Sequence, residues 1–267
     1  MPLRLDPTFG HQLRDAGRPL AGMWVCSGSA LIAEICAGSG LDWLLIDMEH
    51  APNGLESVVA QLHAVSGYPI TPVVRVPVND QVVLKQVLDA GAQNVLVPMV
   101  SSAQEARAAV EGVRYPPRGR RGVGSALARS GRWNRVEGYL HDADQHVSLF
   151  VQIETVEGVH AAAEIAAVDG VDGVFVGPSD LAASLGVLGQ QTHPDVVAAV
   201  RDVFTAVTAA GKPVGVNAFD PTVARSYLEA GATFVLVGAD VALLARSSEA
   251  LAQTWTLDAD DIRESSY

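Results

Sequence analysis

The segment LDAGAQNVLVP, residues 88–98, contains the unit that decides the fold. It has the pattern of a helix end, a glycine that caps it and then a short apolar strand, which together make the second half of a βαβ unit. A similar segment, LEAGATFVLVG, occupies residues 228–238. Any protein that alternates helices with parallel strands produces such pairs, so they indicate the α/β class and identify no function.

Short, β-branched apolar runs recur along the chain, each followed by a turn and a longer segment of helical period. They are AGMWV (21–25), DWLLIDM (42–48), TPVVRVP (71–77), NVLVPMV (94–100), SLFVQIE (148–154), DGVFVG (172–177), KPVGVNA (212–218) and TFVLVGA (233–239). Their continuous aliphatic character suits a parallel sheet that helices cover. Eight strands close a (β/α)8 TIM barrel, which commonly takes about 250 residues. We therefore expect an α/β protein in which residues 1–267 form a single TIM-barrel domain.

The charge balance limits the partners. The chain carries 18 Lys and Arg against 30 Asp and Glu, a net charge of -12, which repels nucleic-acid backbones and acidic membrane surfaces. Cys26 and Cys36 lack the paired CxxC spacing of a zinc site or disulfide scaffold. The N-terminal MPLRLDPTFG has no apolar leader pattern, and no run reaches the roughly 20 apolar residues of a membrane span. These features predict a soluble, cytoplasmic protein that binds neither nucleic acid nor membrane.

Polar side chains collect where the expected strands end, the place where barrels of this class carry their functional groups. Five strand ends have them: Asp47, Glu49 and His50; Arg75; Gln152 and Glu154; Ser179 and Asp180; and Asn217. Side chains alternate along a strand, so Gln152 and Glu154 share a face and can both point into the barrel mouth. Without a thiolate or a histidine pair beside them, two carboxylates from adjacent strand ends are hard oxygen ligands suited to Mg²⁺ or Mn²⁺.

Each of these residues also has a purely structural explanation. Asp180 could cap the helix that follows it, and Glu154 could form a buried ion pair with Arg75. His50 could be a hydrogen-bonded loop histidine, and Gln152 could be satisfied internally. We expect Glu49 to face solvent. One shared site accounts for the group more simply than separate coincidences do.

Motifs for other cofactors are missing from the sequence. There is neither GxGxxG nor GxxxxGK[ST], so nucleotide cofactors such as NAD have little support. No strand end in the candidate site offers a lysine for a Schiff base, because Lys85 and Lys212 fall in helical or pre-strand positions. We therefore expect no PLP and no imine chemistry.

One segment interrupts the alternation of strands and helices. YPPRGRRGVGSALARSGRWNRV, residues 115–136, is longer and richer in Arg, Gly and Pro than an ordinary connection. It is either an arginine-bearing surface loop or a lid that brings cationic donors to an anionic ligand. The sequence does not show how far Arg118, Arg120 and Arg121 reach.

Six segments in order carry a resemblance to a known family: DWLLIDMEHAPN, PVVRVP, LDAGAQNVLVPMV, RYPPRGRRGVGSALARSGRWN, VQIETVEG and VGPSDLAASLG. Together they resemble the HpcH/HpaI family of divalent-metal-dependent (class II) pyruvate aldolases, over nearly the whole chain. The resemblance implies a barrel that reversibly cleaves 4-hydroxy-2-oxo acids, such as 4-hydroxy-2-oxoheptanedioate, to pyruvate and an aldehyde. It also implies Mg²⁺, Mn²⁺ or Co²⁺ as cofactor and a place in the catabolism of aromatic compounds.

The resemblance assigns roles to residues by matching motif. It implies that Glu154 and Asp180 bind the metal, and that Gln152 and the backbone at Ser179 contact pyruvate. Arg75 would stabilise the enolate oxygen. His50 would act as the base with Asp47 beside it, and Asp89, from a neighbouring subunit, would support its basicity.

The resemblance further implies that the C-terminal helix packs on a neighbouring subunit in a homohexamer, a trimer of dimers. After that helix, DADDIRESSY (258–267) is expected to be a solvated tail. Two alternatives stay open: a sugar-acid 2-keto-3-deoxy aldolase, and a macrophomate-synthase-like lyase that forms the same enolate. A barrel that only senses 2-oxo acids is disfavoured, since binding alone needs no base such as His50.

Overall fold

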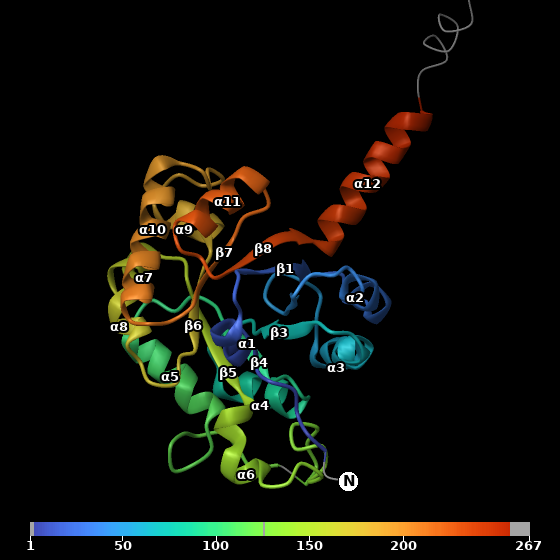
Figure 1. Cartoon of the computed structure of the whole chain (residues 1–267), viewed down its shortest axis with the longest axis vertical. Coiled ribbons are helices and arrows are strands. Elements are labelled where there is room, and N and C mark those ends of the chain that lie inside the picture. Colours follow the sequence, from blue (N-terminus) through green and yellow to red (C-terminus); the bar gives the residue numbers. More distant parts are fainter. Residues whose placement is uncertain (1–2, 125, 257–267) are drawn as a thin grey trace, which may run out of the picture.

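The computed structural model describes residues 3–124 and 126–256. Its centre is a closed barrel of parallel strands in chain order, each bonded to the next and the last to the first (Figure 1). The strands are β1 (Leu20–Val25), β2 (Trp43–Asp47), β3 (Thr71–Arg75), β4 (Asn94–Val97), β5 (Ser148–Ile153), β6 (Gly173–Val176), β7 (Val214–Asn217) and β8 (Phe234–Ala239). Each predicted run overlaps one of them, so the TIM-barrel prediction is confirmed.

Helices connect the strands, and all but the last of them cover the outside of the barrel. They are α2 (Ala30–Ala37), α3 (Leu55–Ala64), α4 (Gln81–Asp89), α5 (Ala103–Val113), α7 (Val156–His160), α8 (Ala162–Ala166), α9 (Pro178–Ser184), α10 (Pro194–Ala209), α11 (Pro221–Glu229) and α12 (Asp240–Trp255). The 3-10 turn η1 (Val65–Gly67) follows α3, and α6 (Tyr139–Asp142) with η2 (Ala143–His146) precedes β5. Side chains fix several helix starts: Asp80 before α4 and Asp220 before α11 each accept two backbone N–H bonds.

Aromatic side chains close the amino-terminal end of the barrel. A helix that the sequence did not predict, α1 (Phe9–Asp15), inserts Phe9 there, with its ring 5.0 Å from Trp43 and 5.6 Å from Phe234 between centroids. Glycines make room for these rings, because a Cβ at Gly22 would overlap Trp43 and one at Gly215 would overlap Phe234. With this end packed shut, the barrel interior is open to a substrate only at the carboxyl ends of the strands.

The arginine-rich segment 115–136 lies at the closed end. It follows α5 and leads back to β5, and the backbone N–H of Arg129 donates to the carbonyl of Asp89, the last residue of α4 (2.9 Å). The named arginines face carboxylates: Arg118 pairs with Asp144 (2.8 Å), Arg120 with Glu111 (2.7 Å) and Arg121 with Asp89 (3.2 Å). In its own chain the segment is therefore a surface structure of the amino-terminal end and not a lid over the mouth.

The last helix, α12, leaves the body of the barrel and projects into solvent (Figure 1). Its large apolar side chains are exposed, including Leu244 at 61% and Trp255 at 80%. The predicted tail 258–267 lies outside the described residues. No helix in the described ranges combines the length and the hydropathy that a membrane crossing needs.

Candidate functional site

The ends of β2 and β3 hold a buried ion pair. Asp47 and Arg75 are register partners, and the guanidinium Nε and Nη2 each donate to a carboxylate oxygen of Asp47 at 2.8 Å. The third nitrogen, Nη1, lies 2.9 Å from Oε2 of Glu49, and the face of the guanidinium lies 4.3 Å from the ring centroid of Trp24. These contacts fix the plane and direction of Arg75. One N–H on each terminal nitrogen remains for a ligand.

Glu49 is the site residue that the sequence interpretation missed. It was expected to face solvent, but its side chain is only 15% exposed and forms an ion pair with Arg75. The sequence could have indicated this position, because side chains alternate along a strand and Glu49 therefore shares a face with Asp47. Burial raises the pKa of Glu49, the charges of Arg75 and His50 lower it, and Asp47 and Asp180 raise it. Glu49 thus pairs with Arg75, and its negative charge also raises the pKa of Glu154.

His50 presents its ring at the rim of the barrel mouth. The ring is exposed, and Nε2 lies 3.8 Å from Oε2 of Glu49. Asp47 meets the histidine through the backbone, because its two oxygens accept the N–H groups of Glu49 (3.0 Å) and His50 (3.3 Å). Asp47 therefore shapes the loop that carries His50, while Glu49 is the carboxylate that faces the ring.

Gln152 and Glu154 both point inward at the end of β5, and each side chain is 2% exposed. Glu154 accepts the backbone N–H of Met99 on Oε1 (2.7 Å) and the Gln152 amide on Oε2. Burial raises the pKa of Glu154 to about 7; the two hydrogen bonds lower it, and the charges of Asp180 and Glu49 raise it. Within the described ranges no cation pairs with Glu154, so the ion pair with Arg75 considered above does not form.

Asp180 lies in the first turn of α9, directly after β6. Its side chain is exposed, and the helix begins at Pro178, after Gly177, without a side-chain cap. Gly177 allows the turn to approach the preceding strand, since a Cβ there would come within 2.6 Å of Oε2 of Glu154. Asp180 follows in this turn, and its negative charge raises the pKa of Glu154.

This corner of the mouth fits a divalent cation of the Mg²⁺ type. Glu154 is a buried carboxylate without a cation, Asp180 is a second carboxylate at its side, and Oε1 of Gln152 is buried without a hydrogen-bond partner. The described residues contain no cluster of three or more His, Cys, Asp or Glu that could hold a metal. Two carboxylates suit ions that keep several waters or substrate oxygens in their coordination shell.

The remaining predicted residues lie in different places. Ser179 lies in the first turn of α9 next to Asp180, and Asn217, at the end of β7, accepts the indole N–H of Trp24 at 2.7 Å. Asp89 ends α4 at the closed end of the barrel, facing Arg121, so this chain does not bring it to its own His50.

A further residue, Asp240 at the start of α12, was not predicted. Its carboxylate accepts the backbone N–H groups of Cys26 (2.8 Å) and Ser27 (3.0 Å) and so fixes the loop after β1 at the mouth. No sequence signal identifies it, because the acceptor and the loop are more than two hundred positions apart.

Comparison with known proteins gives the family. A family model described as HpcH/HpaI aldolase/citrate lyase matches residues 20–247. The chain belongs to this family. It is 52% identical over 257 residues to a hydroxypyruvate/pyruvate aldolase of Deinococcus radiodurans, covering 95% of this chain and 92% of that relative. It is 53% identical over 237 residues to a 4-hydroxy-2-oxo-heptane-1,7-dioate aldolase of Salmonella dublin, covering 89% and 90%.

The likeness extends to a solved structure. An HpcH/HpaI aldolase/citrate lyase family protein from Burkholderia cenocepacia superposes with a TM-score of 0.88 at 43% identity, covering 92% of this chain and 97% of that one. The resemblance found in the six sequence segments is therefore confirmed. Aldolases and citrate lyases both break a carbon–carbon bond, and with the aldolase relatives above this makes the chain a carbon–carbon lyase.

Proposed function

We propose that the chain is a divalent-metal-dependent aldolase that reversibly cleaves 4-hydroxy-2-oxo acids to pyruvate and an aldehyde. One observation carries the proposal: Glu154 is a buried carboxylate with which no described cation pairs, and Glu49, whose charge raises the pKa of Glu154, forms an ion pair with the fixed guanidinium of Arg75. The reaction needs a positively charged group close to the 2-oxo oxygen of the substrate, because this oxygen becomes negative as the C3–C4 bond breaks. The substrate supported by the Salmonella relative is 4-hydroxy-2-oxoheptanedioate.

In cleavage, the base removes the 4-hydroxyl proton, the C3–C4 bond breaks, and its electron pair forms the enolate of pyruvate as the aldehyde leaves. Arg75 donates its free N–H groups to the enolate oxygen, and the pair with Asp47 keeps them aimed there. Protonation of the enolate at C3 then gives pyruvate. Gln152 and the backbone at Ser179 contact the pyruvyl group at the end of β5 and the start of α9.

Glu154 and Asp180 are proposed to hold the divalent cation, Mg²⁺, Mn²⁺ or Co²⁺. When bound, such an ion supplies Lewis acidity toward the 2-oxo oxygen of the substrate. The raised pKa of Glu154 supports this assignment, because a cation at the site would favour the charged carboxylate that burial disfavours. The free Oε1 of Gln152 offers an acceptor next to the same corner.

His50 is proposed as the base that takes the 4-hydroxyl proton. Its exposed ring at the rim of the mouth can reach a substrate directly or through one water, and Oε2 of Glu49 lies 3.8 Å from Nε2 of the ring. Asp89 is proposed to support the histidine of a second copy, since it lies 27% exposed at the closed end of its own barrel.

We also propose a homohexamer, a trimer of dimers, in which α12 packs on a neighbouring copy. The apolar side chains that α12 exposes support this, and Leu31 and Ile35 of α2, each 66% exposed, offer a surface of matching character. A cytoplasmic location and a role in the catabolism of aromatic compounds complete the proposal; the two free cysteines suit a reducing compartment.

The decisive experiment measures pyruvate release from 4-hydroxy-2-oxoheptanedioate, coupled to lactate dehydrogenase. Protein treated with EDTA should be inactive and should recover with Mg²⁺, Mn²⁺ or Co²⁺. Recovery with Glu154→Gln or Asp180→Asn as well would refute the ligand assignment. If no metal restores pyruvate release, shorter and sugar-derived 4-hydroxy-2-oxo acids come next, and failure with all of them rejects the aldolase proposal.

A second candidate uses the same site with another donor. The Deinococcus radiodurans relative is named for hydroxypyruvate as well as pyruvate, which favours carbon–carbon bond formation between hydroxypyruvate and an aldehyde. Incubating the metal-loaded protein with hydroxypyruvate and glycolaldehyde should then consume both. A parallel incubation replaces hydroxypyruvate with pyruvate. If pyruvate is consumed there but hydroxypyruvate is not consumed in the first incubation, this candidate is excluded.

A further inference from the structure

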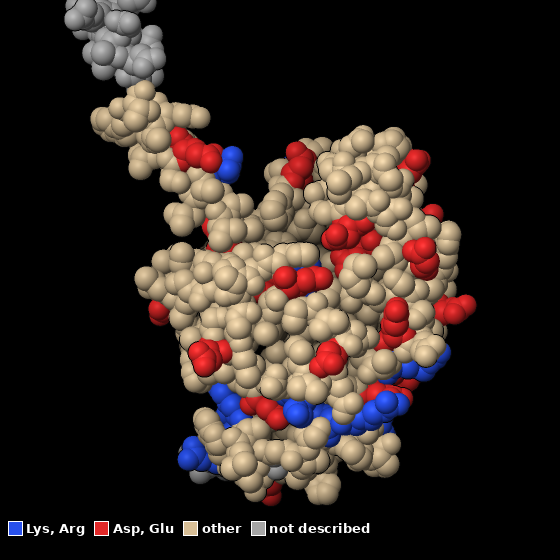
Figure 2. Space-filling view, turned by 180° about the vertical axis from the view of Figure 1, so that it is seen from behind, with Lys and Arg blue, Asp and Glu red and all other residues tan. Residues whose placement is uncertain are grey.

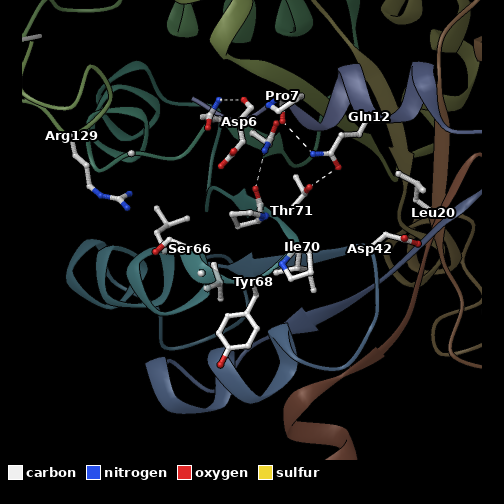
Figure 3. Close-up of a pocket in the computed structure, with 18 of the residues that line it drawn as sticks. Asp6, Pro7, Gln12, Leu20, Asp42, Ser66, Tyr68, Ile70, Thr71 and Arg129 are labelled. Carbon is white, nitrogen blue, oxygen red and sulfur yellow. Dashed lines mark hydrogen bonds between the residues drawn. The ribbon is translucent and has the colours of Figure 1, made fainter. Parts of the chain in front are cut away.

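A cavity of about 670 Å³ opens at the amino-terminal end of the barrel, away from the candidate active site. Figure 3 shows Arg129 at one side of it, Asp6 and Pro7 of the N-terminal segment at another, and Ser66 and Tyr68 after α3 below. The volume falls within the range of about 300–1,000 Å³ that is usual for small-molecule sites. No residue of this cavity has a role in the reaction proposed above.

Two arginines of the segment 115–136 line the cavity. Arg129 and Arg132 are half-buried, and among the residues with described positions no carboxylate lies within ion-pair distance of either. This separates them from Arg118, Arg120 and Arg121 of the same segment, each of which has a carboxylate partner. A half-buried cation without a counter-charge loses hydration that the described structure replaces only in part.

Most N–H donors of the two guanidinium groups are unused. Arg129 donates from Nη1 to the carbonyl of Ala90 (3.3 Å), and Arg132 donates from Nη1 to the carbonyl of Arg129 (2.6 Å). No other side-chain hydrogen bond of either residue is found among the described positions. Arg129 lies directly on the backbone at Gly91, where a Cβ would overlap its guanidinium. The side chain is therefore held in place while its donors stay available.

Several other polar groups of the cavity already have partners, and the carboxylate of Asp6, which also lines the cavity, is an acceptor and not a donor. Gln12 accepts the hydroxyl of Thr71 (2.6 Å), and the amide of Asn94 donates to the carbonyl of Pro72 (3.0 Å). Asp42 is neutralised by two hydrogen bonds from Arg18, at 2.6 and 2.8 Å. The arginines are therefore the principal free donors for a ligand in this cavity.

The charges around the arginines favour an anion. Burial lowers the pKa of Arg129, and the positive charge of Arg132 lowers it further, because the two cations repel each other. Burial also lowers the pKa of His63, and the charges of Arg129 and Arg132 lower it further. The charge of Asp6 acts in the opposite direction on Arg132, but no ion pair within 4 Å joins them. An oxyanion would relieve the repulsion by accepting N–H groups from both guanidinium groups.

The backbone at this place is strained. Arg132, Trp133 and Asn134 follow one another with φ of 50°, 54° and 64°, the left-handed region that side-chain-bearing residues avoid. Such conformations persist where the surrounding structure enforces them, and they cluster at binding sites. Here they begin at Arg132, three positions after Arg129, and both arginines line the same cavity.

We propose that this cavity binds a small oxyanion, a carboxylate or a phosphate group, between Arg129 and Arg132. The site lies at the end of the barrel opposite the mouth, so its ligand is not the molecule that reacts in the same barrel. Bidentate contacts to a guanidinium fork suit both kinds of head group.

Calorimetric titration of the intact protein with inorganic phosphate and, separately, with succinate tests the site, with ionic strength held constant by NaCl. At least one anion should bind saturably to the wild type. Arg129→Gln and Arg132→Gln should each weaken that binding by about ten- to a hundredfold. Arg135→Gln is the matched control, because Arg135 belongs to the same segment but stacks on Trp133 and does not line the cavity. It should bind like the wild type.

A second measurement needs no variant. Phenylglyoxal modifies accessible arginines, and the bound anion should protect Arg129 and Arg132 in the wild type while Arg135 reacts as before. Binding of phosphate alone or succinate alone supports the site and identifies the head group. Absence of saturable binding by both anions overturns the proposal, as does binding that neither variant weakens. If neither anion binds and Arg129→Gln changes the sedimentation coefficient, the arginines contact a second copy and the proposal is also wrong.

Discussion

Asp47 and Arg75 form a buried, two-pronged ion pair across the neighbouring strands β2 and β3, with both N–O distances at 2.8 Å. The same two oxygens of Asp47 accept the backbone N–H groups that begin the loop of His50. One carboxylate thus sets both the direction of the guanidinium and the position of the histidine backbone. The pair is a positioning device for the two groups on which the proposed cleavage depends.

Asp47→Asn should lower kcat/KM by about a hundredfold, because the guanidinium of Arg75 is no longer held in a fixed direction and the His50 loop loses a charged hydrogen-bond acceptor. Removing one partner of a buried pair should also lower the free energy of unfolding by about 3 kcal/mol. The matched control is Asp42→Asn, which breaks the exposed pair with Arg18 and should leave activity unchanged. Urea denaturation and the pyruvate assay measure the two effects. Unchanged activity in Asp47→Asn would mean that Arg75 needs no partner.

Arg75→Lys should leave Mn²⁺ binding intact and reduce turnover strongly, by at least about a hundredfold. A lysine keeps the charge but cannot bind both oxygens of Asp47 and also donate to an enolate oxygen. The readouts are Mn²⁺ titration followed by electron paramagnetic resonance, and kcat in the pyruvate assay. Loss of Mn²⁺ binding would show that Arg75 supports the metal corner, contrary to the roles proposed here.

Cys26 should be unreactive toward thiol reagents in the native protein. Burial, together with the charges of Asp47 and Asp240 and against the opposing charge of Arg75, raises its pKa to about 12. The thiolate is the reacting form, so at pH 8 only about one thiol in ten thousand is ionised, and the rate should rise about tenfold per pH unit toward pH 12. Kinetics with a disulfide reagent measure this, with the urea-unfolded protein as the reactive control. Fast native labelling of Cys26 at pH 8 would contradict it.

The barrel was predictable because its strands are buried on both faces. Continuous runs such as DWLLIDM and SLFVQIE differ from the amphipathic helices between them, and each run overlaps a strand. Helix α1 escaped prediction because FGHQLRD is short and without clear periodicity, and its meaning depends on the aromatic side chains that Phe9 meets inside the barrel. The local sequence pattern predicts the strands and helices, but it does not predict which side chains close one end of the barrel.

The candidate site was predictable as a set of strand ends but not as a set of partners. Placing Gln152 and Glu154 on one face required only the alternation of a strand. That Arg75 pairs with Asp47 and Glu49, and not with Glu154, depends on the register between β2 and β3, which no single segment encodes. The position of Asp89 at the closed end likewise follows from the direction of α4 in the assembled barrel.

Glu154→Gln should stabilise the metal-free protein at high pH while it abolishes divalent-metal binding. The folded-state pKa of about 7 lies above the ordinary glutamate value of 4.5, so the native wild type binds its proton more tightly than the unfolded chain does. The stability that Glu154 contributes is therefore fully present below pH 4.5 and is lost as the pH rises through 7. The neutral amide lacks this dependence. The variant should thus gain up to about 3 kcal/mol over the wild type at pH 8, and little at pH 4.5.

Thermal unfolding in EDTA at pH 5, 6, 7 and 8 measures this difference, and the same series with Mn²⁺ measures the metal. Glu157→Gln is the matched control: this glutamate is three positions further along and exposed in α7, so the substitution should change neither series. Added Mn²⁺ should raise the Tm of the wild type and of Glu157→Gln but not of Glu154→Gln. A Glu154→Gln protein that Mn²⁺ still stabilises would remove Glu154 from the metal corner. A stability difference that does not depend on pH would mean that Glu154 is not held near neutrality by burial.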